Sequence, residues 1–396
     1  MNVTGRNSAR TTSRSERSRI SRETHPGLDV TRISFAAHLE LHLSLRPIPG
    51  EKPSAMVSRL ACMLKDYEAT VIRHEVFGPV SACSETLRAL RHELKGVDWP
   101  VTWIEGGTTS SPVVFGMHIF AVAGTHVNTI CQEGEPVGRI FSDGHVRHCL
   151  LGNVMPSNLS ASKPAQSRET FENIERALSE AGMGMANVVR TWFFLDNILS
   201  WYKPFNTVRT EFYTQRKVFN GLVPASTGVG GRNRAGAAVL AGAWAVQGLE
   251  GSVAAYAVPS PLQCPSMEYG SAFSRAVELT SGDYRRLLVS GTASIGLDGH
   301  SAHSGNLHKQ IAMSMKSVHA ILALHGFDFR DVTRATAYFK NIQDAPAFEG
   351  WRKEQRRDAF PLIVTQSTVC RDELLFEIEL DATLSQKHSA AKPQPK

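Results

Sequence analysis

GMGMANVVRTWFFLDNI at residues 182–198 and GFDFRDVTRATAYFKNI at residues 326–342 are two copies of one pattern, 144 residues apart. Five of the 17 aligned positions are identical, including the arginines Arg190 and Arg334. The apolar pattern agrees at the other positions. Self-similarity at a fixed spacing is typical of a chain built from repeated units. The stretch therefore predicts that one structural unit occurs at least twice.

Each copy lies within the same order of predicted elements. FENIERALSEAG at 171–182 has apolar residues at helical spacing and ends in a glycine, which favours a helix followed by a left-handed stop. VVRTWFFLD, from residue 188, is rich in β-branched and aromatic residues and predicts a buried strand. The second copy repeats this order from residue 315, and a further strand closes each unit, at 237–247 and at 374–382.

A fainter unit precedes these two. Strand, helix and strand patterns follow one another over residues 69–124. We therefore predict an α+β fold of three units in one chain, arranged as a pseudo-trimer with helices packed outside small mixed sheets. The expected divisions are a disordered basic tail at 1–33, units at 34–127, 128–256 and 257–385, and a polar tail at 386–396.

Composition narrows the class of protein. The net charge of +6 comes largely from six arginines within the first 24 residues, which favour a disordered tail or a targeting peptide. Without the tails the chain is nearly neutral, so we expect a small-molecule partner and no nucleic acid. The sequence contains no run of 18 apolar residues, so no membrane span is predicted. The six cysteines are scattered singly, which argues against a disulfide framework or a zinc site and favours a cytoplasmic protein.

Glu377 is the residue most suited to chemistry. It lies between Phe376 and Ile378 on the predicted closing strand of the last unit. Partial burial there would raise the pKa of its carboxyl group and keep a proton available near neutral pH. The alternative is a solvent-facing residue of an amphipathic strand. Glu379 faces the same side of that strand.

Four blocks give the chain a family resemblance. They are PASTGVGGRN at 224–233, YGSAFSRAVE at 269–278, VSGTASIG at 289–296 and VCRDELLFEIELDA at 369–382. The repeated unit resembles the Rid/YjgF family, whose small α+β subunits form homotrimers with ligand sites between subunits. Three such units in one chain look like a chorismatase, a family similar to a fused Rid trimer. The resemblance covers roughly residues 55–385 and is strongest in the last two units.

The resemblance implies an enzyme that converts chorismate to 3-hydroxybenzoate and pyruvate. The resemblance implies Glu377 and Cys370 as catalytic residues. Glu377 would protonate the enolpyruvyl methylene, and Cys370 stands where members that form 3-hydroxybenzoate have cysteine and hydrolytic members tend to have a small apolar residue. Alternatives are a chorismate hydrolase giving 3,4-dihydroxycyclohexa-1,5-dienoate and pyruvate, a bifunctional 3-/4-hydroxybenzoate synthase, or a non-catalytic Rid-like protein that binds a small carboxylate. An imine deaminase is disfavoured, because Leu362 and Ser226 replace the required arginine. The glutamate of the closing strand is present in the last unit as Glu377, whereas the middle unit has Ala241 at the equivalent position.

Chorismate carries two carboxylates, so its site needs guanidinium groups and hydrogen-bond donors. The expected substrate-binding residues are Arg371, Arg147, Arg275, Arg232, Tyr269, Ser290, Gly291 and Ala293. Acid catalysis and carboxylate binding suffice for the reaction, so no metal or organic cofactor is expected. A pseudo-trimer also provides its own interfaces, and we expect a monomer.

Overall fold

The computed structural model describes residues 19–35, 38–106, 114–249, 252–282, 284–355 and 359–385. Most of the predicted N-terminal tail and the whole predicted C-terminal tail lie outside these residues. Within the described ranges, no helix combines the length and the apolar character needed to cross a bilayer.

Three units follow one another along the chain. The first contains β1 (Arg19–His25), β2 (Leu28–Ser34), β3 (Leu39–Leu45), α1 (Pro53–Asp66), β4 (Thr70–Phe77), α2 (Val80–Glu93), β5 (Val101–Ile104) and β6 (Gly116–Ala123). The second contains β7 (Asn128–Gln132), β8 (Glu135–Ser142), β9 (Val146–Val154), α3 (Lys163–Glu180), β10 (Val188–Leu195), α4 (Tyr202–Gln215), β11 (Ala225–Gly230) and β12 (Val239–Gly248). The third contains β13 (Val253–Val258), β14 (Ala276–Ser281), β15 (Tyr284–Ala293), α5 (Leu307–Leu324), β16 (Val332–Phe339), α6 (Pro346–Glu354), β17 (Leu362–Gln366) and β18 (Phe376–Ser385).

Each unit forms a six-stranded mixed sheet, and the three sheets share one topology. Their strand orders are β1-β2-β3-β6-β4-β5, β7-β8-β9-β12-β10-β11 and β13-β14-β15-β18-β16-β17. In each sheet only the last pair is parallel, and the closing strand lies in the middle. The predicted α+β fold of three equivalent units is therefore confirmed.

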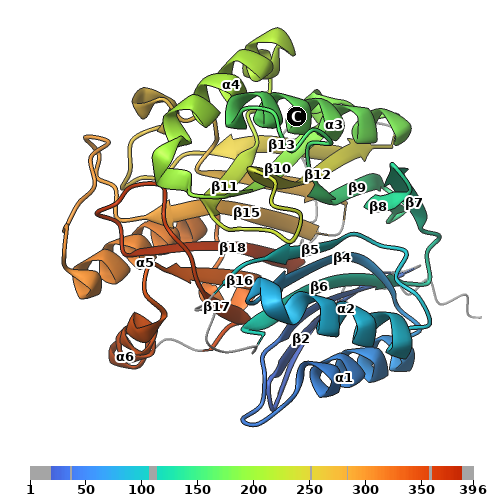
Figure 1. Cartoon of the computed structure of the whole chain (residues 1–396). Coiled ribbons are helices and arrows are strands. Elements are labelled where there is room, and N and C mark those ends of the chain that lie inside the picture. Colours follow the sequence, from blue (N-terminus) through green and yellow to red (C-terminus); the bar gives the residue numbers. More distant parts are fainter. Residues whose placement is uncertain are drawn as a thin grey trace, which may run out of the picture.

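The two faces of each sheet are covered differently. The helices lie on the outside of the molecule and the sheets turn their other faces toward its centre (Figure 1). Each unit has its own apolar core between helices and sheet. A fourth core, which includes Phe77, Trp192 and Tyr338, draws residues from all three units. Because both faces are covered, β10 and β16 are buried along their whole length.

The pseudo-threefold relation is visible in single residues. A register shift interrupts β4, β10 and β16 at the same place, and an arginine follows each shift: Arg73, Arg190 and Arg334. Their guanidinium carbons lie 3.3, 5.0 and 5.5 Å from the centre of the Trp192 ring. The matching arginines of the two sequence copies therefore meet a third one at the centre of the molecule.

Two predicted boundaries are wrong. Residues 19–33, expected in the tail, form β1 and most of β2, so ordered structure begins earlier. The boundary between residues 256 and 257 cuts through β13, which pairs with β14 and belongs to the third sheet. Local sequence pattern indicates an extended segment, but it does not say which sheet that segment joins, because strand pairing is decided by distant residues.

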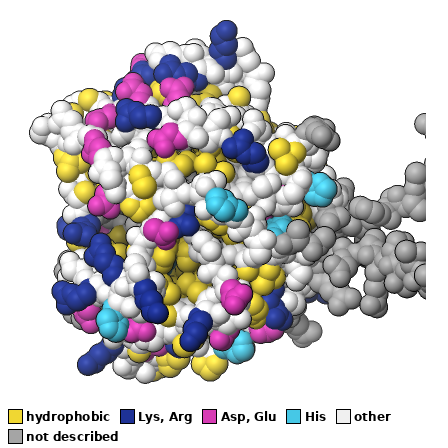
Figure 2. Space-filling model, turned by 90° about the vertical axis from the view of Figure 1, so that its right-hand side faces the viewer, with side chains coloured by type: hydrophobic (Ala, Val, Ile, Leu, Met, Phe, Trp, Pro, Cys, Tyr) yellow, Lys and Arg dark blue, Asp and Glu magenta, His cyan; other side chains and the backbone are white. Residues whose placement is uncertain are grey.

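Surface charge is mixed on the face that Figure 2 presents. Basic and acidic side chains are interspersed there, without a continuous region of one sign (Figure 2). Nucleic-acid binders concentrate Lys and Arg on one face or along one groove. This face has no such concentration.

Candidate active site

Glu377 lies in the middle of the third sheet, where β18 runs between β15 and β16. It pairs with Ala293 on one side and Tyr338 on the other. Phe376 and Ile378 point into the apolar core beneath the helices. Successive side chains of a strand alternate between its faces, so Glu377 points the other way, toward the cleft between the second and third units.

A cavity occupies this cleft. Its lining residues from the second unit are Tyr202 and Arg209 of α4 and Ser226 and Gly228 of β11. Those from the third unit are Tyr269, Phe273, Arg275, Gly291, Ala293, Ile295, Cys370 and Glu377. A wider depression shares Tyr202, Tyr269 and Cys370 with the cavity and adds Lys203 and Arg371, so it forms the cavity mouth.

The carboxyl group of Glu377 faces the cavity without a protein partner. The side chain is 4% exposed, and it forms no hydrogen bond with any described residue. Burial, and then the nearby charge of Glu379, raise the pKa of Glu377 to about 8, against the opposing influence of Arg275 and Arg190. At neutral pH the group is therefore mostly a neutral acid, able to donate a proton into the cavity.

Two guanidinium groups flank the cavity. Arg209 is buried on α4, and its Nη2 donates to Asn206 at 2.5 Å. Arg275 donates Nε and Nη2 to the carbonyl oxygen of Cys264, at 3.0 and 2.8 Å. Both lie against the ring of Phe273, at 6.0 and 5.5 Å from its centre. In the described structure neither forms an ion pair with a carboxylate, so both can bind a carboxylate of an anionic ligand.

Cys370 contributes a thiol to the same wall. Burial, followed by the charge of Glu377, raises the pKa of this thiol to about 12. The sulfur is therefore protonated at neutral pH. A thiolate is the nucleophilic form of cysteine, so Cys370 acts here as a small apolar surface beside Glu377.

The structure brings together six of the predicted site residues. They are Glu377, Cys370, Tyr269, Gly291, Ala293 and Arg275. Arg371 lies at the mouth, where it donates to the carbonyl oxygen of Gly299 at 2.9 Å and lies over the ring of Tyr269.

Three predicted residues lie elsewhere. Arg147 donates to Gln247 and to the carbonyl oxygen of Ala181, away from the cleft. Arg232 is 61% exposed and pairs with Glu105 of the first unit. Ser290 is fully buried, and its hydroxyl accepts from the backbone N–H of Ser226 and donates to the carbonyl oxygen of Ser274. The structure therefore does not place these three side chains in the cavity with Glu377, because sequence proximity to a family-like block does not determine side-chain direction.

Six lining residues were not predicted as substrate contacts. They are Tyr202, Arg209, Ser226, Gly228, Phe273 and Ile295. Arg209 left one signal in the sequence, because it lies on the same helical stripe as the buried residues Phe205 and Phe212. A charged residue on a buried stripe indicates either a paired charge or a site.

The equivalent positions in the other two units carry no acid. Glu377 pairs with Tyr338, and by the same register Leu240 pairs with Phe194 and Gly116 with Phe77. Leu240, not the predicted Ala241, is therefore the counterpart of Glu377, since Ala241 faces the helix side of its sheet. At Gly116 an added Cβ would lie 2.5 Å from the Ile363 side chain, so that interface is filled. Of the three equivalent positions, only the third unit's presents a carboxyl group.

Comparisons with known proteins agree with this architecture. The family model described as Endoribonuclease L-PSP matches residues 152–233. A curated 3-hydroxybenzoate synthase from Streptomyces hygroscopicus is 26% identical over 276 residues, which are 63% of this chain and 77% of that protein. A crystal structure of a chorismatase matches 88% of this chain and 100% of its own, with a TM-score of 0.61 and 16% identity. The chain therefore shares the fold of this chorismatase.

The composition of the cleft differs from that expected of an imine-deaminating Rid protein. Imine-deaminating Rid proteins are expected to have an arginine at the position of Leu362 in the third unit and Ser226 in the second. These two residues occupy matching registers beside β16 and β10. Leu362 packs into the apolar core and Ser226 lines the cavity with no charge. The guanidinium groups of this cleft come instead from α4 and from the segment before β14.

Proposed function

We propose that this protein converts chorismate to 3-hydroxybenzoate and pyruvate. One observation carries the proposal: Glu377, a buried carboxyl group whose pKa is raised to about 8, faces a cleft that also contains the guanidinium groups of Arg209 and Arg275. Chorismate has two carboxylates for the arginines and an enol ether that needs a proton at carbon. The related Streptomyces protein supports the choice of substrate by its name, 3-hydroxybenzoate synthase.

The proposed reaction begins with proton transfer from Glu377 to the terminal methylene of the enolpyruvyl group. The resulting oxocarbenium ion withdraws electrons from the ether bond to the ring. The substrate's 4-hydroxyl attacks the ring carbon as that bond breaks, and the ether oxygen becomes the carbonyl of pyruvate. Glu377 regains a proton from the attacking hydroxyl. The arene oxide then opens and loses its ring proton to give 3-hydroxybenzoate, so the two products contain all the atoms of chorismate and no water is consumed.

One chain suffices for this proposal, because both walls of the cleft come from units of the same chain. We therefore propose that the protein acts as a monomer on a small-molecule substrate.

The test is an incubation of the purified protein with chorismate. Pyruvate is followed with lactate dehydrogenase and the second product is identified by chromatography. Stoichiometric pyruvate and 3-hydroxybenzoate would support the proposal. Absence of pyruvate would refute it and leave a binding protein. Pyruvate with 3,4-dihydroxycyclohexa-1,5-dienoate would show a hydrolase, and a mixture with 4-hydroxybenzoate would show a bifunctional synthase.

Cys370→Ala is expected to change the product more than the rate. The thiol occupies space beside Glu377, and its removal leaves room in which water competes with the 4-hydroxyl. We expect pyruvate release to continue while the non-aromatic diol appears among the products, measured by chromatography. Cys149→Ala is the matched control, since burial also raises the pKa of the Cys149 thiol to about 12, but this residue lies in the core of the second unit. An unchanged product ratio in Cys370→Ala would contradict this role.

Gly291→Ala is expected to displace the acid without unfolding the protein. A Cβ at this position would lie 2.0 Å from Oε1 of Glu377. The carboxyl group is the free end of a flexible side chain, so it moves and the fold stays, but kcat falls by about 100-fold because the proton donor is misplaced. Gly184→Ala is the control, because a Cβ there meets no atom within 4 Å. Full activity in Gly291→Ala would show that the position of Glu377 tolerates displacement.

A further inference from the structure

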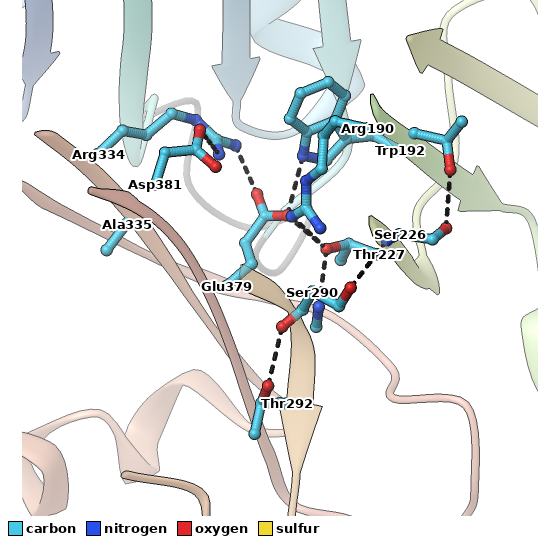
Figure 3. Close-up of polar contacts among 12 residues, drawn as sticks. Arg190, Trp192, Ser226, Thr227, Ser290, Thr292, Arg334, Ala335, Glu379 and Asp381 are labelled. Carbon is cyan, nitrogen blue, oxygen red and sulfur yellow. Dashed lines mark hydrogen bonds and ion pairs between the residues drawn. The ribbon is translucent and has the colours of Figure 1, made fainter. Parts of the chain in front are cut away.

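Glu379 lies two residues after Glu377 on the same face of β18. Glu377 has no hydrogen-bond partner among the described residues, whereas Glu379 is surrounded by donors. Its carboxylate accepts hydrogen bonds from five side chains: Arg190 (2.6 Å), Trp192 (2.9 Å) and Thr227 at Oε2, and Arg334 and Tyr338 (3.3 Å) at Oε1. Figure 3 shows four of these donors converging on it from both sides. Every partner is a donor, so no position is left for a proton and the group is ionised.

This charge belongs to a balanced cluster at the pseudo-threefold axis. The cluster contains the arginines Arg73, Arg190 and Arg334 and the carboxylates Glu75, Glu379 and Asp381. All six side chains are buried. In the described structure, Glu379 is the one carboxylate that pairs with Arg190.

The position of Glu379 is not a general requirement of the fold. By strand register, its counterparts are His118 in the first unit and Gly242 in the second. Each of the three units has the axial arginine, yet only the unit with the acid Glu377 has a carboxylate at this position. The pairing of a neutral and an ionised carboxyl group on one strand therefore coincides with the candidate active site.

Thr227 connects the ionised carboxylate to the acid. Its hydroxyl donates to Oε2 of Glu379 and accepts from the backbone N–H of Gly291 at 3.0 Å. Gly291 is the residue over which the carboxyl group of Glu377 lies. Through Thr227 the charge cluster is therefore hydrogen-bonded to the backbone next to the carboxyl group of Glu377.

We propose that Glu379 is a positioning residue for the reaction proposed above, whose fixed negative charge keeps the proton on Glu377 until the substrate takes it. This inference rests on the proposed function, because Glu379 can assist the reaction in this way only if Glu377 is the proton donor. Paired carboxyl groups driven to opposite states by their surroundings are a recurring basis for acid catalysis.

The charged and titratable groups around Glu377 come from several elements. They are Glu379 on its own strand, Arg190 of β10, Arg275 before β14, Tyr202 and Arg209 of α4, Tyr269 and Cys370. Burial is the largest influence that raises the pKa of Glu377, and Glu379 is the next. Removing the charge of Glu379 also leaves Arg190 unneutralised. Both changes lower the pKa of Glu377.

Glu379→Gln tests the inference through the pH profile of pyruvate release. We expect the alkaline limb of kcat to move toward acid by about one pH unit or more, while activity persists below the new limb. Glu379→Asp retains the charge and should retain the wild-type limb. Glu40→Gln is the matched control: Glu40 is an equally buried carboxylate paired with Arg286, outside the cavity, and its loss should leave the limb in place. An unmoved limb in Glu379→Gln, or an equal movement in Glu40→Gln, would overturn the inference.

A direct titration separates this inference from the proposed function. Carbon-13 NMR of protein labelled at the glutamate carboxyl carbons, assigned with Glu377→Gln and Glu379→Gln, reports both groups in the wild type without any substrate. We expect Glu379 to stay ionised from pH 5 to pH 9, roughly the range in which a shifted glutamate titrates, and Glu377 to titrate near 8. A Glu379 that takes up a proton in this range would overturn the inference even if chorismate is turned over. Absence of turnover with these titrations intact would remove the proposed function alone.

Discussion

Glu377→Gln is expected to lower kcat for pyruvate release from chorismate by about 10³-fold, because an amide has no proton acidic enough to transfer to carbon. The substitution preserves the size of the side chain and leaves Arg209 and Arg275 in the cavity. Chorismate should therefore still bind, and its affinity, measured by calorimetry, should stay close to that of the wild type. Near-normal turnover in this variant would show that another group is the acid.

The same residue predicts how the wild-type rate depends on pH. The active form of Glu377 is the protonated one, and its pKa is raised to about 8. The rate should therefore be level through neutral pH and fall as the pH rises through about 8. A glutamate with its ordinary pKa, about 4.3, would lose its proton far below neutrality and give an acidic optimum. An acidic optimum of kcat would contradict the burial argument.

Arg209→Gln is expected to have the second largest effect, lowering kcat/KM for chorismate by about 100-fold, since a charged contact to a desolvated carboxylate contributes a few kcal/mol. Arg209 is buried beside the cavity and has only Asn206 as a hydrogen-bond partner among the described residues. The loss should appear mainly in KM, because the contact binds the substrate without taking part in proton transfer. Steady-state kinetics with the pyruvate assay measures both constants.

Arg232→Gln is the control for that variant. Arg232 lies in one of the family-like blocks, but its side chain is exposed and paired with Glu105. An exposed ion pair contributes little, so kcat/KM and thermal stability should both remain near the wild-type values. Equal losses in the two variants would mean that the effect of Arg209 is not one of direct contact.

Four of the predicted site residues that the structure brings into the cavity lie close together in one unit. Glu377, Cys370, Gly291 and Ala293 lie on or beside the two central strands of the third unit, and β15 and β18 pair directly. Strand pattern and the family-like blocks describe relations within one unit, which is why they could group these four residues. The error at Ala241 was a slip of one residue, which on a strand moves the side chain to the opposite face.

Two of the lining residues that sequence reasoning missed lie across a unit boundary from Glu377. Arg209 and Tyr202 reach the cavity because α4 of the second unit lies beside the third sheet. Arg147 is close in sequence to the turn of β9 but points to the outer part of its own unit. The local sequence around Arg209 or Arg147 does not indicate how the units pack against one another.

The repeated pattern by itself determined the α+β unit, its recurrence, and the strand on which the acid lies, because apolar periodicity and turn residues act over a few neighbouring positions. Only the tertiary structure decided which arginines face that acid and which carboxylate beside it is ionised. Burial and charge pairing depend on side chains from three units that meet at one axis. The distances between these side chains are set by residues far apart along the chain.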